Sequence, residues 1–93
     1  MSLLLAHYKV TDTAVFDQVF DEFEATRREC GATGHRVLHA VDDPQIVVVM
    51  IEFPGGDAAA AFAQDPRRAD ALTRAGVIER SDIVLDGGPA VSY

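Results

Sequence analysis

Five side chains that can carry charge or move protons lie within or beside the hydrophobic stretches of this sequence. Histidine is well suited to transfer protons near neutral pH, because its ordinary pKa is about 6.5. An apolar cleft that holds a few such groups is the usual form of a small-molecule binding site. In the strand pairing that the sequence predicts, one face of a sheet gathers all five residues, which are His7, Lys9, His35, His39 and Glu52.

This grouping depends on a predicted hairpin. Residues 33–41 and 46–53 each have the composition of a strand, and the polar segment 42–45, Asp-Asp-Pro-Gln, is typical of the turn between paired strands. Successive side chains of a strand point to opposite faces, so the register decides which residues share a face. The register that we expect pairs Val41 with Ile46, His39 with Val48, Val37 with Met50, and His35 with Glu52.

A metal site does not fit these histidines. His35 and His39 are four positions apart on one strand, which separates them by about 13 Å at roughly 3.3 Å per residue, too far to share one ion. His7 lies on a different strand, at about 9 to 10 Å from the strand of the other two. Gly55 and Gly56 lack the lysine and the spacing of a phosphate-binding loop. We therefore expect neither a metal nor another cofactor.

Each candidate also has a structural interpretation. His7 fits a histidine at an interface between subunits, and Glu52 fits an ion-pair partner of His35 or of an arginine. Tyr8 is expected to point to the opposite, helix-covered side of the sheet, where its hydroxyl group needs a hydrogen-bond partner. Cys30 is predicted at the C-terminal end of a helix, where the helix dipole disfavours a thiolate, so we do not expect it to act as a nucleophile.

The composition excludes several classes of partner. The formal net charge is -7, and the basic residues are dispersed apart from the pairs at 27–28 and 67–68, so nucleic acids and anionic membranes are not expected to bind. The single cysteine cannot form an internal disulfide, which fits the reducing cytoplasm. No stretch approaches the roughly 20 apolar residues of a membrane span. We expect a cytoplasmic protein.

The stretch at residues 46–53 is apolar on both faces, so both sides of its sheet need a cover. The first predicted elements are a strand at Leu3–Val10 and a helix that begins after Thr11 or Asp12 and stops at Gly31. Two strands follow, at Thr33–Val41 and Ile46–Phe53. A second helix begins at about Asp57, is interrupted at Asp65-Pro66 and ends near Gly76, and the last strand is Ser81–Asp86. This order predicts one α+β domain over residues 1–93, with a ferredoxin-like βαββαβ topology: an antiparallel four-stranded sheet with both helices on one face.

The other face of this sheet has no cover within the chain. An aliphatic patch on it would exceed the few hundred Å² that soluble monomers usually expose. Burial of each large side chain contributes about 1.5 to 3 kcal/mol, so association of two sheets would stabilise the protein. We predict a homodimer that is closed through this face. The residues expected in the patch are Leu3, Leu5, Val37, Ile46, Val48 and Met50.

Four short segments carry a resemblance to known proteins: Thr33-Gly34-His35-Arg36, Asp42-Asp43-Pro44, Glu52-Phe53 and Ala59–Phe62. They resemble the antibiotic biosynthesis monooxygenase family of dimeric α+β barrel proteins. Members tend to have a glycine before the second strand, an Asp-Pro turn, an apolar strand that ends in Glu-x-aromatic, and an alanine-rich helix. The resemblance is clear over residues 33–72 and looser over the first strand and helix.

The resemblance implies a cofactor-free monooxygenase-like enzyme that acts on a small aromatic or polyketide-type substrate in an apolar cleft. A non-catalytic dimeric barrel, which binds a small ligand or is structural, is the alternative. The chain has no Trp and no Asn, on which the haem-degrading and the best understood aromatic-oxidising members rely, so those mechanisms do not carry over residue by residue. A cleft of about 300 Å³ or more beside His7 would favour the enzyme.

In a cofactor-free oxygenation, a base removes a phenolic proton and the resulting anion reacts with oxygen. His7 lies midway along the first strand, where the family often has a polar cleft residue, and is the candidate catalytic base. The candidate substrate-binding residues are Tyr8, Lys9, His35, His39, Met50 and Glu52.

Overall fold

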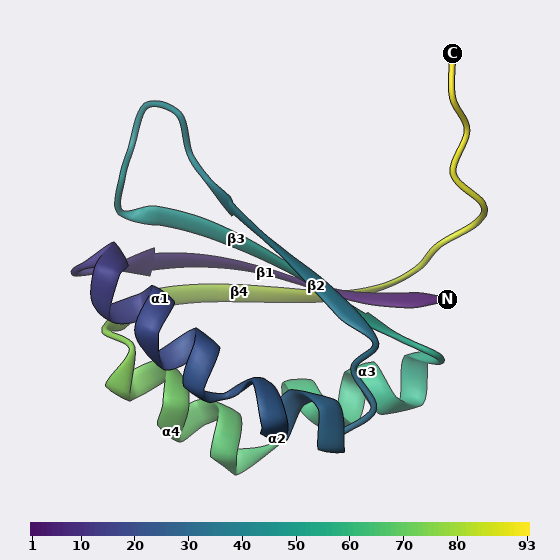
Figure 1. Ribbon diagram of the computed structural model, residues 1–93, viewed down its shortest axis with the longest axis horizontal. Helices are drawn as coiled ribbons and strands as arrows, with labels where there is room; N and C mark the ends of the chain where they lie inside the picture. Colours follow the sequence, from purple (N-terminus) through teal and green to yellow (C-terminus); the bar gives the residue numbers. More distant parts are fainter.

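The computed structural model describes residues 1–93, which form a single antiparallel sheet with all helices on one of its faces (Figure 1). The strands lie in the order β2-β3-β1-β4, so the two central strands come from the first strand and the central apolar stretch of the sequence. The predicted α+β, ferredoxin-like arrangement is confirmed. The elements are β1 (Ser2–Val10), α1 (Thr13–Glu22), α2 (Glu24–Glu29), β2 (Gly34–His39), β3 (Ile46–Phe53), α3 (Gly56–Ala63), α4 (Pro66–Arg74) and β4 (Val77–Asp86).

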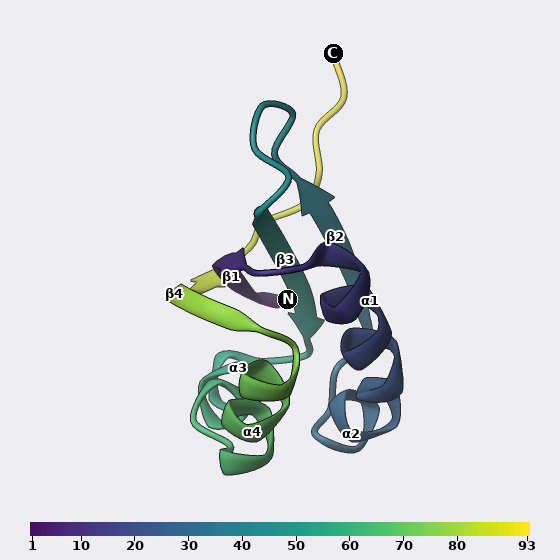
Figure 2. The same cartoon turned by 90° about the vertical axis from the view of Figure 1, so that its left-hand side faces the viewer.

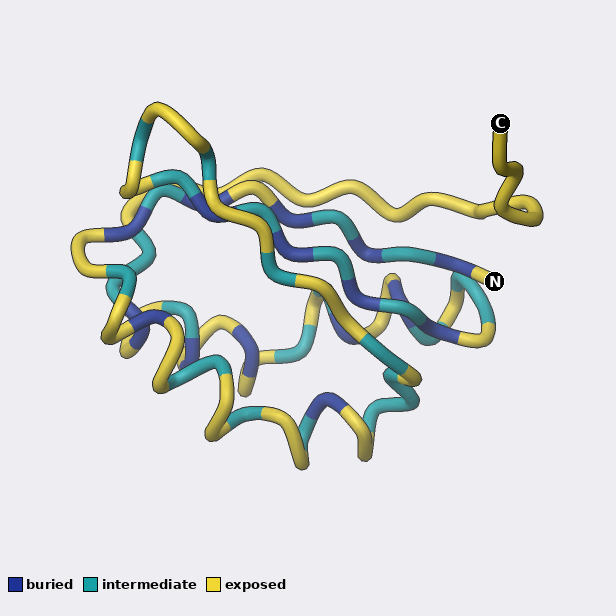
Figure 3. The backbone as a smooth tube through the Cα atoms, turned by 45° about the horizontal axis from the view of Figure 1, so that its top comes forward, coloured by how far each residue is buried: buried dark blue, intermediate teal, exposed yellow.

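The helices form two limbs beneath the sheet, α1 with α2 and α3 with α4, as a view turned by 90° shows (Figure 2). None of the helices is long and apolar enough to span a bilayer. Coloured by burial, the backbone shows that the central strands alternate between buried and half-buried residues, whereas β4 and the C-terminal tail are mostly exposed (Figure 3). One face of the sheet is therefore covered, and the other is open.

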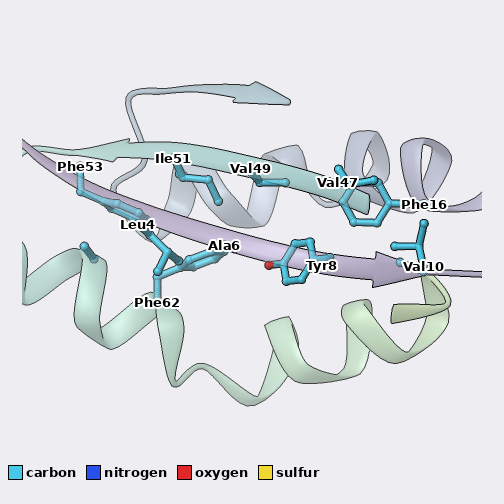
Figure 4. Close-up of a cluster of buried hydrophobic side chains, with 12 residues drawn as sticks. Leu4, Ala6, Tyr8, Val10, Phe16, Val47, Val49, Ile51, Phe53 and Phe62 are labelled. Carbon is cyan, nitrogen blue, oxygen red and sulfur yellow. The ribbon is translucent and has the colours of Figure 1, made fainter. Parts of the chain in front are cut away.

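The hydrophobic core fills the space between the sheet and the helices (Figure 4). Every second residue of β1 and β3 points into it, which is the side-chain periodicity of a strand. Phe16 of α1 and Phe62 of α3 are buried against these strands. The buried residues of the two central strands are Leu4, Ala6, Tyr8, Val10, Val47, Val49, Ile51 and Phe53.

Local signals in the sequence fix the helix ends. Asp12 is the N-cap of α1, where its carboxylate accepts a hydrogen bond from the Ala14 N–H at 2.9 Å. Asp65 does the same for α4, and Pro66 follows it at the first helical position. Gly76 ends the second limb with φ of +78°, a conformation that favours glycine. These caps agree with the sequence predictions.

The first predicted helix is not continuous. It breaks at Phe23, whose N–H is shared between the carbonyl oxygens of Val19 and Phe20 at 3.1 and 3.3 Å. A single helix up to Gly31 was the wrong expectation, because no proline or glycine marks the break. As a result, α2 is a separate helix of six residues.

Two strand predictions also need correction. β4 starts at Val77 rather than Ser81, because it pairs with β1 along the whole length of that strand. The expected register between β2 and β3 is wrong by one residue: Val37 lies opposite Val49 rather than Met50. The cause is the turn, in which the Ala40 N–H bonds to the Ile46 carbonyl at 3.1 Å and Val41 is left in the exposed loop.

A slip of one residue moves every side chain of a strand to the other face. His35, Val37 and His39 therefore lie on the helix side of the sheet, and Leu38 replaces Val37 in the aliphatic patch of the open face. That open face, as the structure shows it, carries Leu3, Leu5, Leu38, Ile46, Val48, Met50, Ile83 and Leu85.

Candidate functional site

The open face of the sheet holds four of the seven predicted site residues. His7 lies between Val48 of β3 and Ser81 of β4, and Lys9 lies opposite both Ile46 and Glu79. Met50 and Glu52 lie on the same face of β3. His7 is exposed and lines none of the hollows in the surface. The structure of one chain therefore shows no cleft beside the candidate base.

The other three predicted residues lie on the helix side, so the expected gathering of five titratable residues on one face is wrong. The ring of His35 packs edge-on against Phe20, with 5.0 Å between the ring centroids. His39 is exposed at the end of β2, opposite Val47. Tyr8 points into the helix-sheet core, as its alternation with His7 predicts.

A hollow of about 350 Å³ at one edge of the open face brings Met50 and Glu52 together, and His35 borders it although its ring lies on the helix side. It is lined by His35, Met50 and Glu52, together with Met1, Leu3 and Arg36. Lys9 and His39 do not reach it. No group of three or more His, Cys, Asp or Glu side chains lies together as a set of metal ligands.

A second space lies inside the molecule, between the sheet and the two helical limbs. This cavity has a volume of about 30 Å³ and ten hydrophobic lining residues, which include Phe16, Phe20 and Phe23 from the first limb and Phe62 from the second. Only two of its lining residues are charged, Arg27 and Arg68, and Tyr8 adds a hydroxyl group from the sheet. We call this space the interior cavity.

Arg68 is buried, with 2% of its surface exposed, and its charge is neutralised by Asp82. Its two terminal nitrogens donate to the two carboxylate oxygens at 2.8 and 2.9 Å, the bidentate geometry that suits a guanidinium. Nη2 also donates to the Tyr8 hydroxyl at 2.7 Å, and Nη1 donates to the Ala63 carbonyl at 3.1 Å. The network ties α4 to both β1 and β4.

The pKa values in this network follow from burial and charge. Burial raises the pKa of Tyr8 above its ordinary value, although Arg68 opposes the change. Burial acts to lower the pKa of Arg68, but the hydrogen bond to Asp82 and the interactions with Tyr8 outweigh it, so the pKa is raised. Tyr8 therefore stays protonated and Arg68 stays charged at neutral pH.

Arg27 is equally buried but has no such partner. Its side chain is 2% exposed, its Nη1 donates to the Phe20 carbonyl, and its guanidinium carbon lies 3.7 Å from the centroid of the Phe20 ring. Nη2 is buried without a hydrogen-bond partner. Burial lowers the pKa of Arg27. A buried donor without a partner costs about 1 to 3 kcal/mol, and more when it is charged, so this nitrogen calls for a physical explanation.

Arg27 and Arg68 were not among the site residues predicted from the sequence. A signal for Arg27 exists, because it follows Phe16, Phe20 and Phe23 on the apolar stripe of the first predicted helix, four residues after Phe23. No comparable signal exists for Arg68 and Asp82, which lie 14 residues apart and meet only through the fold.

Comparisons with known proteins agree on the fold. No protein-family model and no curated protein matches the sequence. Among solved structures, SnoaB, a cofactor-independent oxygenase from Streptomyces nogalater, matches with a TM-score of 0.80 and 16% identity over 99% of this chain and 97% of its own.

Two further structures, both provisionally named antibiotic biosynthesis monooxygenases, are similar. The Bordetella bronchiseptica protein matches with a TM-score of 0.80 and 13% identity over 95% of this chain and 97% of its own. The Deinococcus radiodurans protein matches with a TM-score of 0.72 and 16% identity over 100% of this chain and 98% of its own. The chain therefore has the ferredoxin-like α+β fold of the antibiotic biosynthesis monooxygenases, as its sequence resemblance implied.

Proposed function

We propose that the protein is a monooxygenase-like enzyme that oxidises a small aromatic or polyketide-type substrate without a bound cofactor, and that the substrate binds in the interior cavity. The observation that carries the proposal is the combination of aromatic walls with two buried arginines in this cavity. The fold, which a cofactor-independent oxygenase shares, supports the type of reaction by analogy.

The chemistry begins with an acidic phenol or enol. Loss of its proton to water leaves an electron-rich anion, which adds O₂ at carbon, and the resulting peroxide anion takes up a proton to give a hydroperoxide. Loss of water from the hydroperoxide then gives a carbonyl, so one oxygen atom enters the product and the other leaves as water. Buried guanidinium groups favour the anion, because opposite charges attract strongly in an apolar environment.

The substrate has to widen the interior cavity. Its volume of about 30 Å³ has room for roughly two water molecules at about 10–15 Å³ each, which is less than an aromatic ring needs. The break at Phe23 divides the first limb and supplies a place where α2 can move relative to α1. We therefore propose that α2 moves when the substrate binds.

Filling the interior cavity is expected to slow turnover strongly. Ala71 of α4 is buried and lines the cavity, so Ala71→Leu would occupy space that the substrate needs. The rate of oxygen uptake with hydroxylated anthrones or naphthols is expected to fall at least tenfold. Overpacking costs about 1 to 3 kcal/mol of stability, so circular dichroism must show that the variant is folded.

The matched control is Ala69→Leu, an exposed position on the same helix, which is expected to keep the rate of the wild type. A folded Ala71→Leu variant with the normal rate would place the reaction outside the interior cavity.

His7 gives a separate test in the same assay. It lies on the open face, on the opposite side of the sheet from the interior cavity, so His7→Ala is expected to retain the rate of the wild type. A large loss of rate with His7→Ala would support the prediction from the sequence that His7 is the base, and would move the reaction to the open face.

We also propose that two chains associate through their open faces. The face carries eight aliphatic side chains, and Leu38, Ile83 and Leu85 remain 43%, 51% and 38% exposed. An exposed apolar patch of this kind is typical of an interface between subunits. In such a dimer, His7 and the hollow with Glu52 would lie at the interface, away from the interior cavity.

A further inference from the structure

Arg27 Nη2 is the one buried side-chain nitrogen or oxygen atom in the chain that has no hydrogen-bond partner. Nη1 of the same guanidinium is bonded to the Phe20 carbonyl, and one face of the group is covered by the Phe20 ring. No carboxylate lies within ion-pair distance of Arg27, whereas Arg68 is neutralised by Asp82. The fold therefore leaves one buried cation without an anion, at the wall of an apolar cavity.

We infer that Arg27 binds the anionic oxygen of an aromatic ligand, a phenolate or an enolate, whose ring lies among the phenylalanines of the interior cavity. The charge of Arg27 selects the anion over the neutral phenol, since only the anion neutralises the guanidinium. The aromatic walls select a ring, because aromatic side chains stack favourably on one another. The inference rests on the proposed function for the choice of site, but it concerns binding and requires no turnover.

Arg27 lines two spaces: the interior cavity and a surface hollow of about 310 Å³. Arg27 thus borders both spaces, Phe20 stacks on its guanidinium and lines the interior cavity, and His35 lines the hollow and packs edge-on against Phe20. The six-residue helix α2 carries Arg27 and begins at the break. Arg27 is the residue that the two spaces share, so a ligand that moves from the hollow into the cavity passes the residue that binds its anion.

The titratable and charged groups around Arg27 come from several elements. Asp21 and Glu24 lie on the same limb and act on Arg27 through charge, Tyr8 lies across the cavity, and His35 lies beyond Phe20. Arg68 adds a second positive charge to the cavity wall, but Asp82 neutralises it. The remaining groups therefore leave Arg27 as the cation with an unmet hydrogen bond.

The test uses 4-nitrophenol as the probe, because its phenolate form has a visible absorbance that is distinct from that of the neutral phenol. The absorbance of the probe is titrated against pH with and without the wild-type protein. We expect the pKa of the bound probe to fall by at least about one unit, which corresponds to a tenfold preference for the anion. The neutral analogue 4-nitroanisole reports on the aromatic walls alone.

Arg27→Gln is expected to abolish the pKa shift and to weaken phenolate binding at least tenfold, while 4-nitroanisole binds as it does to the wild type. Arg27→Lys keeps the charge and is expected to restore part of the shift, which a residue with a purely structural role would not do. The control variant is Arg74→Gln, an arginine of α4 that borders neither the interior cavity nor the hollow, whose side chain is 54% exposed and which is expected to behave like the wild type. Circular dichroism verifies the fold of each variant.

Three results would overturn the inference. The first is that the wild-type protein does not bind 4-nitrophenol at millimolar concentration. The second is that the Arg27→Gln variant shows an unchanged pKa shift of the probe. The third is that formate or chloride displaces the probe as effectively as another phenolate does. Oxygen uptake separates this inference from the proposed function. Selective phenolate binding without turnover of any substrate would sustain the inference and refute the function, whereas turnover by the wild type together with an unchanged pKa shift in Arg27→Gln would do the reverse.

Discussion

Asp82→Ala is expected to lower the free energy of unfolding by about 3 to 5 kcal/mol, since removal of one partner of a buried ion pair leaves the other charge uncompensated. The Arg68 side chain is only 3% exposed and that of Asp82 is 23% exposed, so water can screen the remaining charge only weakly. The loss is a large fraction of the roughly 5 to 15 kcal/mol that stabilises a typical domain. Denaturation with urea at a fixed protein concentration measures it.

Two controls show whether the cause is the buried charge. Asp70→Ala removes a carboxylate from the exposed pair between Arg74 and Asp70, and we expect it to cost less than about 1 kcal/mol. The double variant Arg68→Met with Asp82→Ala removes both buried charges and is expected to recover part of the stability. If Asp82→Ala were no more destabilising than Asp70→Ala, the network of Arg68, Tyr8 and Asp82 would not hold α4 to the sheet.

The second large effect is expected at Leu5, near the middle of the open face. Leu5 lies opposite Met50 on one side and Ile83 on the other. In a two-fold symmetric dimer each substitution occurs twice, so Leu5→Glu places two carboxylates in the interface. Desolvation of a charge costs several kcal/mol, so the dissociation constant is expected to rise at least a hundredfold, which requires about 3 kcal/mol.

Sedimentation equilibrium at micromolar concentration measures this change. The wild type is expected to have the mass of a dimer and Leu5→Glu the mass of a monomer. Val15→Glu is the control, since Val15 is 42% exposed on α1, on the helix side of the sheet. A wild type that sediments as a monomer would contradict the proposed dimer, and the exposed aliphatic patch would then need another explanation.

The order of the elements was predictable because its signals are local. Asp12 and Asp65 mark the starts of helices, Gly31 and Gly76 mark their ends with φ of +100° and +78°, and the apolar stretch at Ile46–Phe53 indicates the central strand. Each signal acts within a few residues of the structure that it specifies. The fold class follows from this order, and the structure confirms it.

The face on which the histidines of β2 lie was not predictable in the same way. It depends on whether Val41 belongs to the strand or to the turn, and both options suit the sequence. One residue in the turn decides the face of His35 and His39, so a small uncertainty became a large error in the candidate site. Because side chains alternate between the two faces of a sheet, an error of one residue in the register reverses the predicted face of every residue in the strand.

The interior cavity was harder still to foresee, because its polar residues come from separate elements. Arg27 on α2, Arg68 on α4 and Tyr8 on β1 meet only after the helices pack under the sheet. Two of them stand in consecutive Arg-Arg pairs, in which one arginine is exposed and the other is buried. The residue type is the same for both members of such a pair, and only their positions on the helix determine which arginine is buried.

The Arg68 to Asp82 pair has a consequence beyond one chain. β4 forms an outer boundary of the sheet, and the backbone groups on its outer side are available to any other strand that approaches. Charged side chains along such a strand oppose this recruitment, and Arg80, Asp82 and Asp86 supply them on the helix-facing side of β4. Asp82 therefore serves two purposes at once: it neutralises a buried cation within the molecule, and it makes β4 a poor template for aggregation between molecules.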